Sequence, residues 1–240
     1  VHTTKPCVLQ LLFCLRPGGA ERLALNILEQ GQGRFRGIVA GLYEPPGDLA
    51  AMAERIGLSA VALRAEGKSR LTGIRLLYNL LRREKVTLLH AQATYLLPFA
   101  LPAALLAGVP LLYTEHSIHA LTLMPKLRLF IRLATPLTRG AVCVSEQLAE
   151  YFEQMGVAPG RITVIPNGVN LKDFTPQGNL HQLPWNSEPR QELFVFGTVG
   201  RLNEAKDHGN LLRAFALVSQ RHAGARLLLV GDGELRMDNN

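Results

Sequence analysis

The sequence has 240 residues, 48% of them hydrophobic, which is enough to bury the core of one large domain or of two small ones. Its mean hydropathy lies below that of a polytopic membrane protein, so that class is excluded. A formal net charge of +7 points to an anionic partner. Nucleic acid is not favoured as that partner, because the sequence has no recognised binding motif and does not interleave aromatic residues with cations.

Strand-like and helical patterns alternate along the first 169 residues. This order predicts parallel βαβ units with right-handed crossovers, and therefore an α/β fold. Short apolar runs such as CVLQLLFC, at 7–14, are typical of strands that are buried on both faces. In chain order we expect strands at 7–14, 35–43, 59–65, 86–92, 110–116, 141–146 and 162–168, and helices at 21–30, 48–57, 71–84, 96–108, 124–138 and 146–156.

The most apolar run, LLPFALPAALLAGVPLLY at 96–113, is long enough to raise the question of a membrane span. Pro98, Pro102, Gly108 and Pro110 interrupt it. We therefore expect these residues to break the run into a short helix, a turn and a buried strand.

A polar segment with three prolines and no periodicity, at 170–191, interrupts the alternation and predicts a linker. A strand pattern at 192–200, a helix at 208–222 and a strand at 225–231 follow. Two strands and one helix bury their apolar faces poorly, so we expect either a covering partner or a longer chain. The predicted organisation is an N-terminal Rossmann-like domain at 1–169, a linker at 170–191 and the start of a second such domain at 192–240.

The positive charge is uneven along the chain. Residues 179–240 contain seven cations and seven anions, so the whole excess lies in the first 178 residues. Two stretches, 68–85 and 125–139, alternate cations with leucine or isoleucine at near-helical spacing. Each is either the solvated face of a helix or a basic amphipathic surface that meets anionic lipid.

Three cysteines, Cys7, Cys14 and Cys143, stand in apolar strand-like runs and are not paired at metal-binding spacing. They are typical of reduced, buried thiols in a cytoplasmic protein. The first residues show no signal-peptide pattern. We expect a cytoplasmic location, with peripheral attachment at the inner face of the membrane.

Ligands of open α/β sheets bind beyond the carboxyl ends of the strands, so the residues there are the candidates for a site. Gly18 and Gly19 follow the first strand and precede a helix, as in a phosphate-binding turn or a plain tight turn. His90 and His116 come at the ends of the fourth and fifth strands, where each is an active-site histidine or a hydrogen-bonded core residue. His119 completes an HxxH pair with His116, but no third ligand is evident and we predict no metal site.

In the second half, Arg201 and Lys206 follow the strand at 192–200 and precede a helix. A forked guanidinium, a lysine and a helix N-terminus together suit a diphosphate. The alternative is surface pairing with Glu204 and Asp207. Asp232-Gly-Glu234 is similar to an acidic metal-sugar motif, but its place in a glycine-rich turn favours a structural role.

The sequence resembles the retaining glycosyltransferases of family four, which have the GT-B fold of two facing Rossmann-like domains. The resemblance rests on five blocks in the family's order, which span nearly the whole chain: RPGGAERLALNIL, LLHAQ, YTEHS, VIPNGVNLKDF, and GTVGRLNEAKDHGNLLRAFALV with RLLLVGDGELR. It implies transfer of a sugar, with retained configuration, from a UDP- or GDP-linked donor to a saccharide or lipid-linked acceptor, in cell-surface polysaccharide or glycolipid synthesis. It implies no cofactor and no obligatory metal.

The resemblance also implies roles for the candidate residues. Arg201 and Lys206 would hold the donor diphosphate and stabilise the leaving group, and His116 would contact the sugar near the reacting centre. The remaining implied contacts are Gly18, Gly19, Gly231, Asp232 and Gly233 with the donor, and His90 and Asn167 with the acceptor or sugar.

One departure from the family concerns a pair of glutamates, seven residues apart, that the family places downstream of VGDGE. The sequence ends before them, so we expect a truncated second domain and an inactive chain. Two further readings stay open: a non-catalytic GT-B-like module that binds acceptor or membrane, and a sugar-nucleotide epimerase. The PNGVN and GRLNEAKD blocks favour the transferase over the epimerase.

Overall fold

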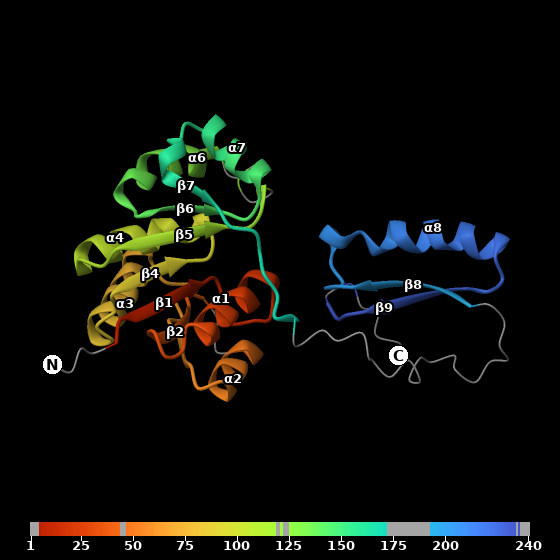
Figure 1. Cartoon of the computed structure of the whole chain (residues 1–240), viewed down its shortest axis with the longest axis horizontal. Coiled ribbons are helices and arrows are strands. Elements are labelled where there is room, and N and C mark those ends of the chain that lie inside the picture. The colour runs from red at the N-terminus through yellow and green to blue at the C-terminus, as the bar shows by residue number, and fades with distance from the viewer. Residues whose placement is uncertain are drawn as a thin grey trace. The chain divides into compact units, whose positions relative to one another are not determined.

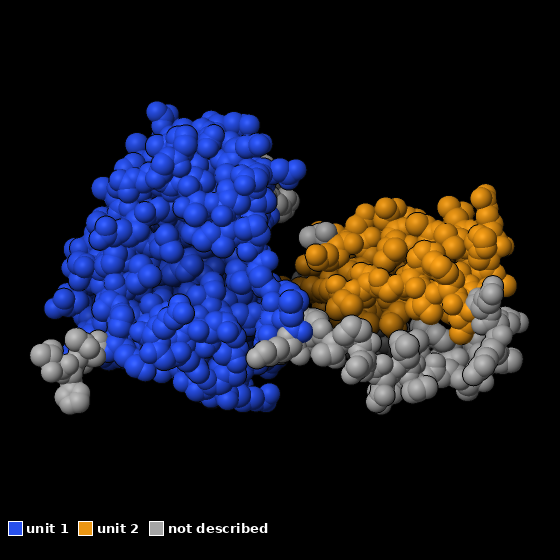
Figure 2. All heavy atoms as spheres, in the orientation of Figure 1, with its two compact units in different colours: residues 1–174 blue, residues 175–240 orange. Residues whose placement is uncertain are grey.

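The computed structural model describes residues 5–43, 47–118, 121, 125–171, 193–233 and 235. The chain falls into two compact units, 1–174 and 175–240, which are coloured separately in Figure 2. Each unit is described by itself below. Most of the predicted linker lies outside the described residues, so the predicted domain boundaries stay predictions.

Unit 1 is built on a seven-stranded parallel sheet with the order β3-β2-β1-β4-β5-β6-β7 (Figure 1). Every neighbouring pair of strands is parallel, as the alternation of strand and helix patterns predicts. The strands are β1 (Cys7–Leu12), β2 (Arg36–Gly41), β3 (Ser59–Ala62), β4 (Leu88–Ala91), β5 (Leu111–Glu115), β6 (Gly140–Cys143) and β7 (Ile162–Val164).

The strand order reverses direction at β1, and right-handed crossovers therefore place helices on both faces of the sheet. Helices α1 and α2 cover one face of β1–β3, and the other face carries α3, α4, α6 and α7. Their bounds are α1 (Gly19–Gln30), α2 (Asp48–Arg55), α3 (Arg70–Arg83), α4 (Leu97–Ala107), α6 (Pro125–Ala134) and α7 (Glu146–Gln154), with 3-10 turns η1 (Thr94–Leu96), η2 (Thr135–Leu137) and η3 (Pro159–Arg161).

The core of unit 1 consists of two apolar layers, one on each face of the sheet. Tyr113 and Phe152 are fully buried in the larger layer, beneath α3, α4, α6 and α7. Leu12, Leu28 and Leu49 fill the smaller layer, beneath α1 and α2. The central strands of this sheet bury both faces, which explains why their sequences are continuous apolar runs, whereas the edge strands β3 and β7 are only partly buried.

The apolar run at 96–113 forms a helix, a turn and a buried strand, as predicted. Helix α4 ends at Gly108, whose φ of 68° is left-handed, and β5 begins at Leu111. The predicted helix at 96–108 forms as α4, which continues through Pro102. Pro102 stands in the second turn, so it removes one backbone hydrogen bond while its buried neighbours Leu101 and Ala103 keep the helix packed. Over the described residues, no helix has the length and apolarity needed to cross a membrane.

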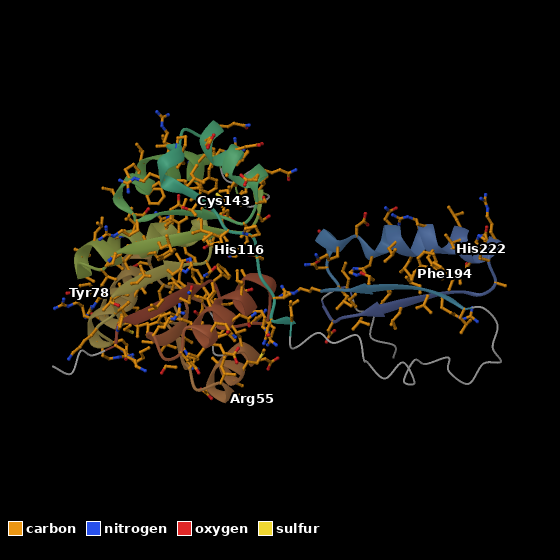
Figure 3. All side chains as sticks on the ribbon, in the orientation of Figure 1. Arg55, Tyr78, His116, Cys143, Phe194 and His222 are labelled. Atoms are coloured by element: carbon orange, nitrogen blue, oxygen red, sulfur yellow. The ribbon has the colours of Figure 1, made fainter. Side chains whose placement is uncertain are left out.

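The described part of unit 2, residues 193–233 and 235, contains two parallel strands and one long helix: β8 (Phe194–Val199), α8 (His208–Arg221) and β9 (Ala225–Val230), with the 3-10 turn η6 (Glu204–Lys206). Of its described apolar side chains only Ala225 is fully buried. Phe194, which is labelled in Figure 3, is 67% exposed. This exposure matches the expectation that two strands and one helix bury their apolar faces poorly.

The three cysteines form no disulfide. Cys7 and Cys143 are buried, as predicted, whereas Cys14 is half-buried. Burial and, to a smaller extent, the nearby Glu115 carboxylate together raise the pKa of the Cys143 thiol to about 12, so this thiol stays protonated. It is therefore an unreactive core residue (Figure 3).

Candidate functional site

A buried polar network lies near the carboxyl ends of β1, β4 and β5. Gln92 is its centre: its Nε2 donates to Gln10 Oε1 at 2.6 Å, and its Oε1 accepts from His116 Nε2 at 2.9 Å. His90 lies 3.4 Å from the same amide nitrogen through Nδ1, and its Nε2 lies 2.8 Å from Thr114 Oγ1. The two predicted histidines are thus joined through a glutamine that was not among the predicted site residues.

The placement of the two histidines differs in one respect from the prediction. His116 follows β5, as expected (Figure 3). His90, however, is the penultimate residue of β4 and is only 7% exposed. It points to the α1 face of the sheet, since Gln10 is its register partner on β1 and Gln92 is two residues farther along the chain.

The network fixes the tautomers of both imidazoles. The Gln92 amide nitrogen can only donate, so His90 Nδ1 is an acceptor and His90 Nε2 carries the proton that faces Thr114. The Gln92 carbonyl can only accept, so His116 Nε2 carries the proton as well. His116 Nδ1 is buried and has no hydrogen-bond partner among the described residues. It therefore has the capacity to accept one more hydrogen bond, although the atom is closed to solvent in this structure.

Both imidazoles are neutral at pH 7. Burial and, to a smaller extent, the neighbouring His116 together lower the pKa of His90 to about 4. Burial also lowers the pKa of His116, partly offset by the carboxylate of Glu115. A pair of neutral, oriented imidazoles can position hydroxyl groups without adding charge.

Glu115 holds the loop that carries His116. Its carboxylate is 2% exposed, and its Oε1 accepts from the backbone nitrogens of His116 at 2.8 Å and of Ser117 at 3.0 Å. Its Oε2 accepts from the nitrogen of Thr94 at 3.1 Å and from the Thr94 hydroxyl. Several hydrogen bonds to a buried carboxylate offset the cost of its burial, and they tie the two connections that follow β4 and β5.

A pocket of about 710 Å³ lies within unit 1, over the part of the sheet that α1 and α2 leave uncovered. His90 and Thr114 line its floor, and the predicted Asn167 lines it from the segment after β7. The structure thus brings His90 and Asn167 to one pocket. Most of the other lining side chains are apolar, from β5, β6 and the segment after β7, whereas α1 contributes both apolar and polar ones.

The glycine turn after β1 ends at the N-terminus of α1. Gly18 is the N-cap, and no side chain of the described residues caps the first backbone N–H groups there. A Cβ at Gly19 would meet no atom within 4 Å, so that position opens to space rather than to packed protein. At Gly18, by contrast, a Cβ would lie 2.2 Å from Glu21 Oε2, so a carboxylate already stands beside this helix N-terminus, and its role as a phosphate-binding turn stays a prediction.

An aromatic cluster missed by the sequence analysis lies at the same edge of the sheet. Phe13 follows β1 and is 40% exposed, with its ring 4.8 Å from that of Tyr43 and 5.7 Å from that of Tyr95. Tyr43 in turn contacts Phe99. Aromatic faces beside a polar site are suited to stacking on a sugar ring or an apolar chain.

In unit 2, the two predicted cations lie close to the carboxyl end of β8. Arg201 comes two residues after the strand, and the Lys206 side chain folds over Gly200, where a Cβ would lie 3.8 Å from Lys206 Cε. Asp207 caps α8 by accepting from the nitrogen of Asn210 at 3.3 Å. The Asp207 carboxylate therefore satisfies one backbone N–H group in the first turn of α8. The sequence left open that this carboxylate pairs with the two cations instead.

Gly231, Asp232 and Gly233 form the turn after β9. A Cβ at Gly231 would lie 1.9 Å from Gly200 O, and one at Gly233 would lie 2.3 Å from Leu202 O. The backbone also pairs here, from Leu202 N to Asp232 O at 2.9 Å. Close packing of the two strand-end turns therefore requires these glycines, whatever further contact they make.

Metal binding has no support in the described part of the chain, where no three His, Cys, Asp or Glu residues are grouped. His119 of the HxxH pair lies outside the described residues. Three residues that the sequence analysis missed, Gln10, Gln92 and Glu115, complete the network in unit 1. Gln92 could have been found, because it stands two positions after His90 and so shares its face.

Comparison with known proteins identifies the family. The model of Glycosyltransferase Family 4 matches residues 17–173. The UDP-Gal:alpha-D-GlcNAc-diphosphoundecaprenol alpha-1,3-galactosyltransferase of Escherichia coli is 30% identical over 68% of this chain and 44% of its own length. The putative glycosyltransferase EpsF of Bacillus subtilis is 26% identical over 98% of this chain and 64% of its own.

A solved structure supports the fold. The Anabaena HepE protein in complex with UDP-glucose superposes with a TM-score of 0.74 at 22% identity, over 94% of this chain and 60% of that one. The predicted fold class is confirmed: α/β with parallel sheets of the GT-B type. The chain spans less than two thirds of the length of each of these three proteins. Because the family model covers well over half of the sequence, the chain belongs to Glycosyltransferase Family 4.

Proposed function

We propose that this chain takes part in transferring a sugar from a nucleotide-sugar donor to an acceptor, with retention of configuration. The observation that carries the proposal is the pair of cations at the carboxyl end of β8, with Arg201 two residues past the strand and Lys206 folded over Gly200. Membership of Glycosyltransferase Family 4 supports the same reaction class.

The chemistry follows from the charges. Breaking a sugar–phosphate bond places negative charge on the leaving diphosphate, so fixed cations stabilise the transition state more than the ground state. Arg201 supplies a fork for two phosphate oxygens and Lys206 a point charge. The N-terminus of α1, at Gly18 and Gly19, offers further N–H groups to an anion.

The residues of unit 1 orient the sugar and acceptor in this proposal. His116 is neutral, and its Nδ1 accepts a hydrogen bond from a sugar hydroxyl while Gln92 holds its Nε2 proton. His90 and Asn167 face the unit 1 pocket, which takes part of the acceptor or sugar. Orientation of this kind lowers the barrier by removing the entropy of bringing two reactants together.

The relatives favour a UDP-linked donor and a lipid-linked acceptor. The Anabaena structure holds UDP-glucose, and the Escherichia coli relative is named for UDP-galactose and a diphosphoundecaprenol-linked sugar. We extend both to this chain, with a place in cell-surface polysaccharide or glycolipid synthesis. A lipid-linked acceptor also implies peripheral attachment at the inner face of the membrane.

Calorimetric titration of the 240-residue chain with UDP and with GDP tests the proposal. We expect UDP to bind, and Arg201→Ala and Lys206→Ala each to weaken binding by about 1.5–3 kcal/mol, the range for charge-assisted hydrogen bonds. Arg221→Ala is the matched control, because Arg221 is an exposed arginine at the other end of α8. Equal affinities for the wild type and both variants, or no binding of either nucleotide, would contradict the proposal.

A further inference from the structure

We propose that one flank of unit 1 docks onto an anionic phospholipid bilayer through exposed leucines on α4, α6 and η2. This inference rests on the proposed function, which implies membrane attachment without saying which surface makes it. We call this surface the leucine face, and define it by Leu105, Leu106, Leu129, Leu133 and Leu137.

The side chains of the leucine face are unusually exposed for leucines. Leu106 is 71% exposed and Leu133 is 64% exposed, and the other three lie between 56% and 60%. Leu129, Leu133 and Leu137 are four residues apart, so they form one stripe along α6 and into η2. Leu105 and Leu137 line the same pocket, which joins this stripe to the end of α4. Grouped exposure of this kind marks an interaction surface, whereas scattered exposed leucines do not.

The segment that carries the leucine face is basic, whereas the next helix, α7, carries the exposed carboxylates Glu146, Glu150 and Glu153. Residues 97–145 contain four cations and a single carboxylate, Glu115, which is buried. Arg128 is engaged within the protein, through a hydrogen bond to Leu121 O and a position over the Tyr151 ring. Lys126, Arg132 and Arg139 are exposed. Leucines bordered by cations are complementary to the acyl boundary and the negative headgroups of an anionic bilayer.

A pocket at one end of the leucine face has the chemistry of a headgroup site. It encloses about 440 Å³ and is lined by Leu105 and Leu137 together with Arg139 and Arg161. Arg161 is held there by a 3.3 Å hydrogen bond to Thr138 O. Two guanidinium groups beside two leucines suit a lipid phosphate with its chains against the leucines.

The position of this pocket is compatible with a working site. Arg139 immediately precedes β6 and Arg161 immediately precedes β7, so the pocket lies at the amino ends of the strands. The histidine and glutamine network lies at the carboxyl ends. Docking through the leucine face therefore leaves the candidate site uncovered.

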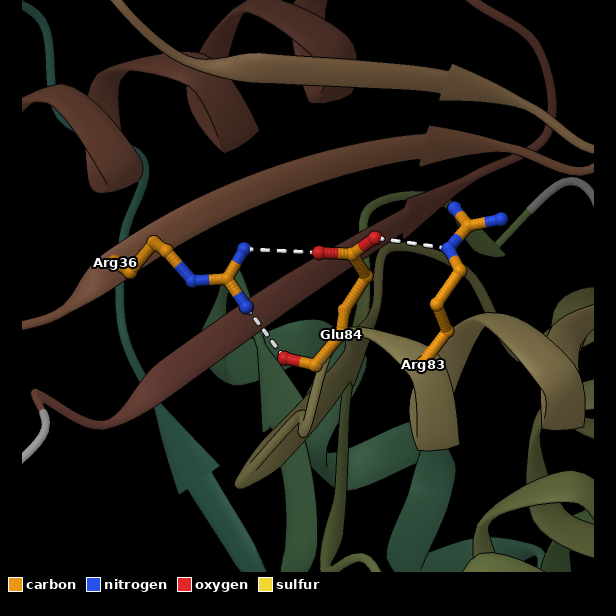
Figure 4. A network of polar contacts seen from close by, with 3 residues as sticks. All are labelled: Arg36, Arg83 and Glu84. Atoms are coloured by element: carbon orange, nitrogen blue, oxygen red, sulfur yellow. Dashed lines mark hydrogen bonds and ion pairs between the residues drawn. The ribbon is translucent and has the colours of Figure 1, made fainter.

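The other basic stretch, 68–85, is less suited to a bilayer. Its helix, α3, presents one strongly exposed leucine, Leu71, at 77%. At its end Glu84 forms ion pairs with Arg36 and Arg83, each at 3.0 Å (Figure 4). The Glu84 carboxylate thus compensates part of the positive charge of the stretch 68–85. A single exposed leucine also contributes little apolar area to a contact with a bilayer. The structure therefore favours 125–139 of the two stretches that the sequence analysis left open.

Vesicle flotation with the full 240-residue chain tests the inference. Vesicles of phosphatidylcholine alone are compared with vesicles in which about a third of the lipid is phosphatidylglycerol. We expect binding to the anionic vesicles at low salt, weakening as salt rises. The double variant Leu129→Ser/Leu133→Ser should reduce binding about tenfold or more, because it removes two apolar side chains from the bilayer contact. Leu71→Ser is the matched control and should bind like the wild type.

A second pair of variants separates charge from apolar contact. Arg139→Gln/Arg161→Gln should weaken binding to anionic vesicles and flatten its dependence on salt. Failure of the wild type to bind anionic vesicles at low salt overturns the inference, as does equal loss in the Leu71→Ser control. A dimer in sedimentation analysis that Leu129→Ser/Leu133→Ser abolishes would instead assign the leucine face to a second copy of the chain.

Nucleotide titration in parallel distinguishes this inference from the proposed function. Absence of vesicle binding with UDP binding intact overturns the leucine face alone. Absence of nucleotide binding with vesicle binding intact overturns the proposed function alone. The leucine variants are expected to keep the UDP affinity of the wild type, because none of the substituted residues belongs to the candidate site.

Discussion

The two units of this chain use the same α/β pattern but differ greatly in what they bury. Unit 1 has seven strands with helices on both faces, and its large side chains Tyr113 and Phe152 are fully buried. Unit 2 has two strands and one helix, and of its described apolar residues only Ala225 is buried. Burial of apolar surface is the main favourable term in folding, so most of the stability must reside in unit 1.

The two units also differ in how they hold the residues of the candidate site. In unit 1 the polar groups are held by one another within a packed sheet, as Gln92 and Glu115 show. In unit 2 the cations stand on turns whose geometry depends on close backbone packing, at Gly231 and Gly233. We therefore expect the unit 1 half of the site to be preorganised, and the unit 2 half to depend on what covers its sheet.

The largest expected effect comes from separating the units. Residues 1–174 alone should unfold in urea with one cooperative transition and a free energy of unfolding of about 5–15 kcal/mol. Residues 175–240 alone should show no such transition, because their apolar side chains stay exposed. Circular dichroism during urea titration makes the measurement. Cooperative unfolding of 175–240 would contradict this prediction.

Digestion of the whole chain with a protease should cut first within the polar segment 170–191 and leave unit 1.

A matched pair of phenylalanines gives the next largest effect. Phe152 is fully buried beside Tyr113, whereas Phe194 is 67% exposed on β8. Phe152→Ala should lower the free energy of unfolding by about 3–5 kcal/mol, because it leaves a cavity in a packed core. Phe194→Ala should change it by less than about 0.5 kcal/mol. Urea midpoints for both variants check the prediction, and equal losses would show that the exposed sheet of unit 2 is covered in solution.

Most of the fold could be predicted from the sequence, because its strands are continuous apolar runs and its helices are periodic. Every strand and helix of the structure falls at a predicted position. The helix predicted at 96–108 is one example, because α4 forms there with Pro102 inside it. The glycine turn after β1 and the two cations were predicted as site residues because each stands between a strand and the following helix, and their roles stay predictions.

The rest of the site could not be found from sequence spacing alone. Gln10 and Gln92 are far apart in the chain, and only the pairing of β1 with β4 brings them within hydrogen-bond distance. In the sequence Glu115 is only the last residue of a strand pattern. Its role in holding two loops follows from the structure, where its carboxylate oxygens accept hydrogen bonds from the backbone nitrogens of Thr94 and His116. Such contacts depend on register and loop geometry, which residue patterns do not encode.

The pH dependence of stability sharpens the view that unit 1 holds a preorganised network. The pKa of His90 is about 4 in the folded protein against an ordinary value of 6.5, so the unfolded chain takes up the proton first as the pH falls. His90 therefore contributes full stability above pH 6.5, and that contribution is lost between pH 6.5 and 4. The wild type should lose about 2–3 kcal/mol more than His90→Gln over this interval. Urea titrations of 1–174 at several pH values make the comparison, and parallel curves would show that the imidazole is not buried in solution.

The smallest expected effect uses two helix caps whose hydrogen bonds have the same length. Ser145 Oγ accepts from Leu148 N in unit 1, and Asp207 Oδ1 accepts from Asn210 N in unit 2, each at 3.3 Å. Ser145→Ala should lower the cooperative unfolding free energy by about 1 kcal/mol, because α7 is part of the packed sheet. Asp207→Ala should leave that transition in place and only speed hydrogen exchange in the first turn of α8, because α8 contributes little burial. The φ of Asp207 is 46°, which makes alanine unfavourable at this position. The control is therefore Asp207→Asn, because asparagine keeps an acceptor and tolerates that backbone. The control for the other cap is Ser145→Thr. Hydrogen exchange followed by mass spectrometry reads both effects at once. If Asp207→Ala shifted the main transition as far as Ser145→Ala, the two units would fold as one, and the difference in burial would not set the difference in stability.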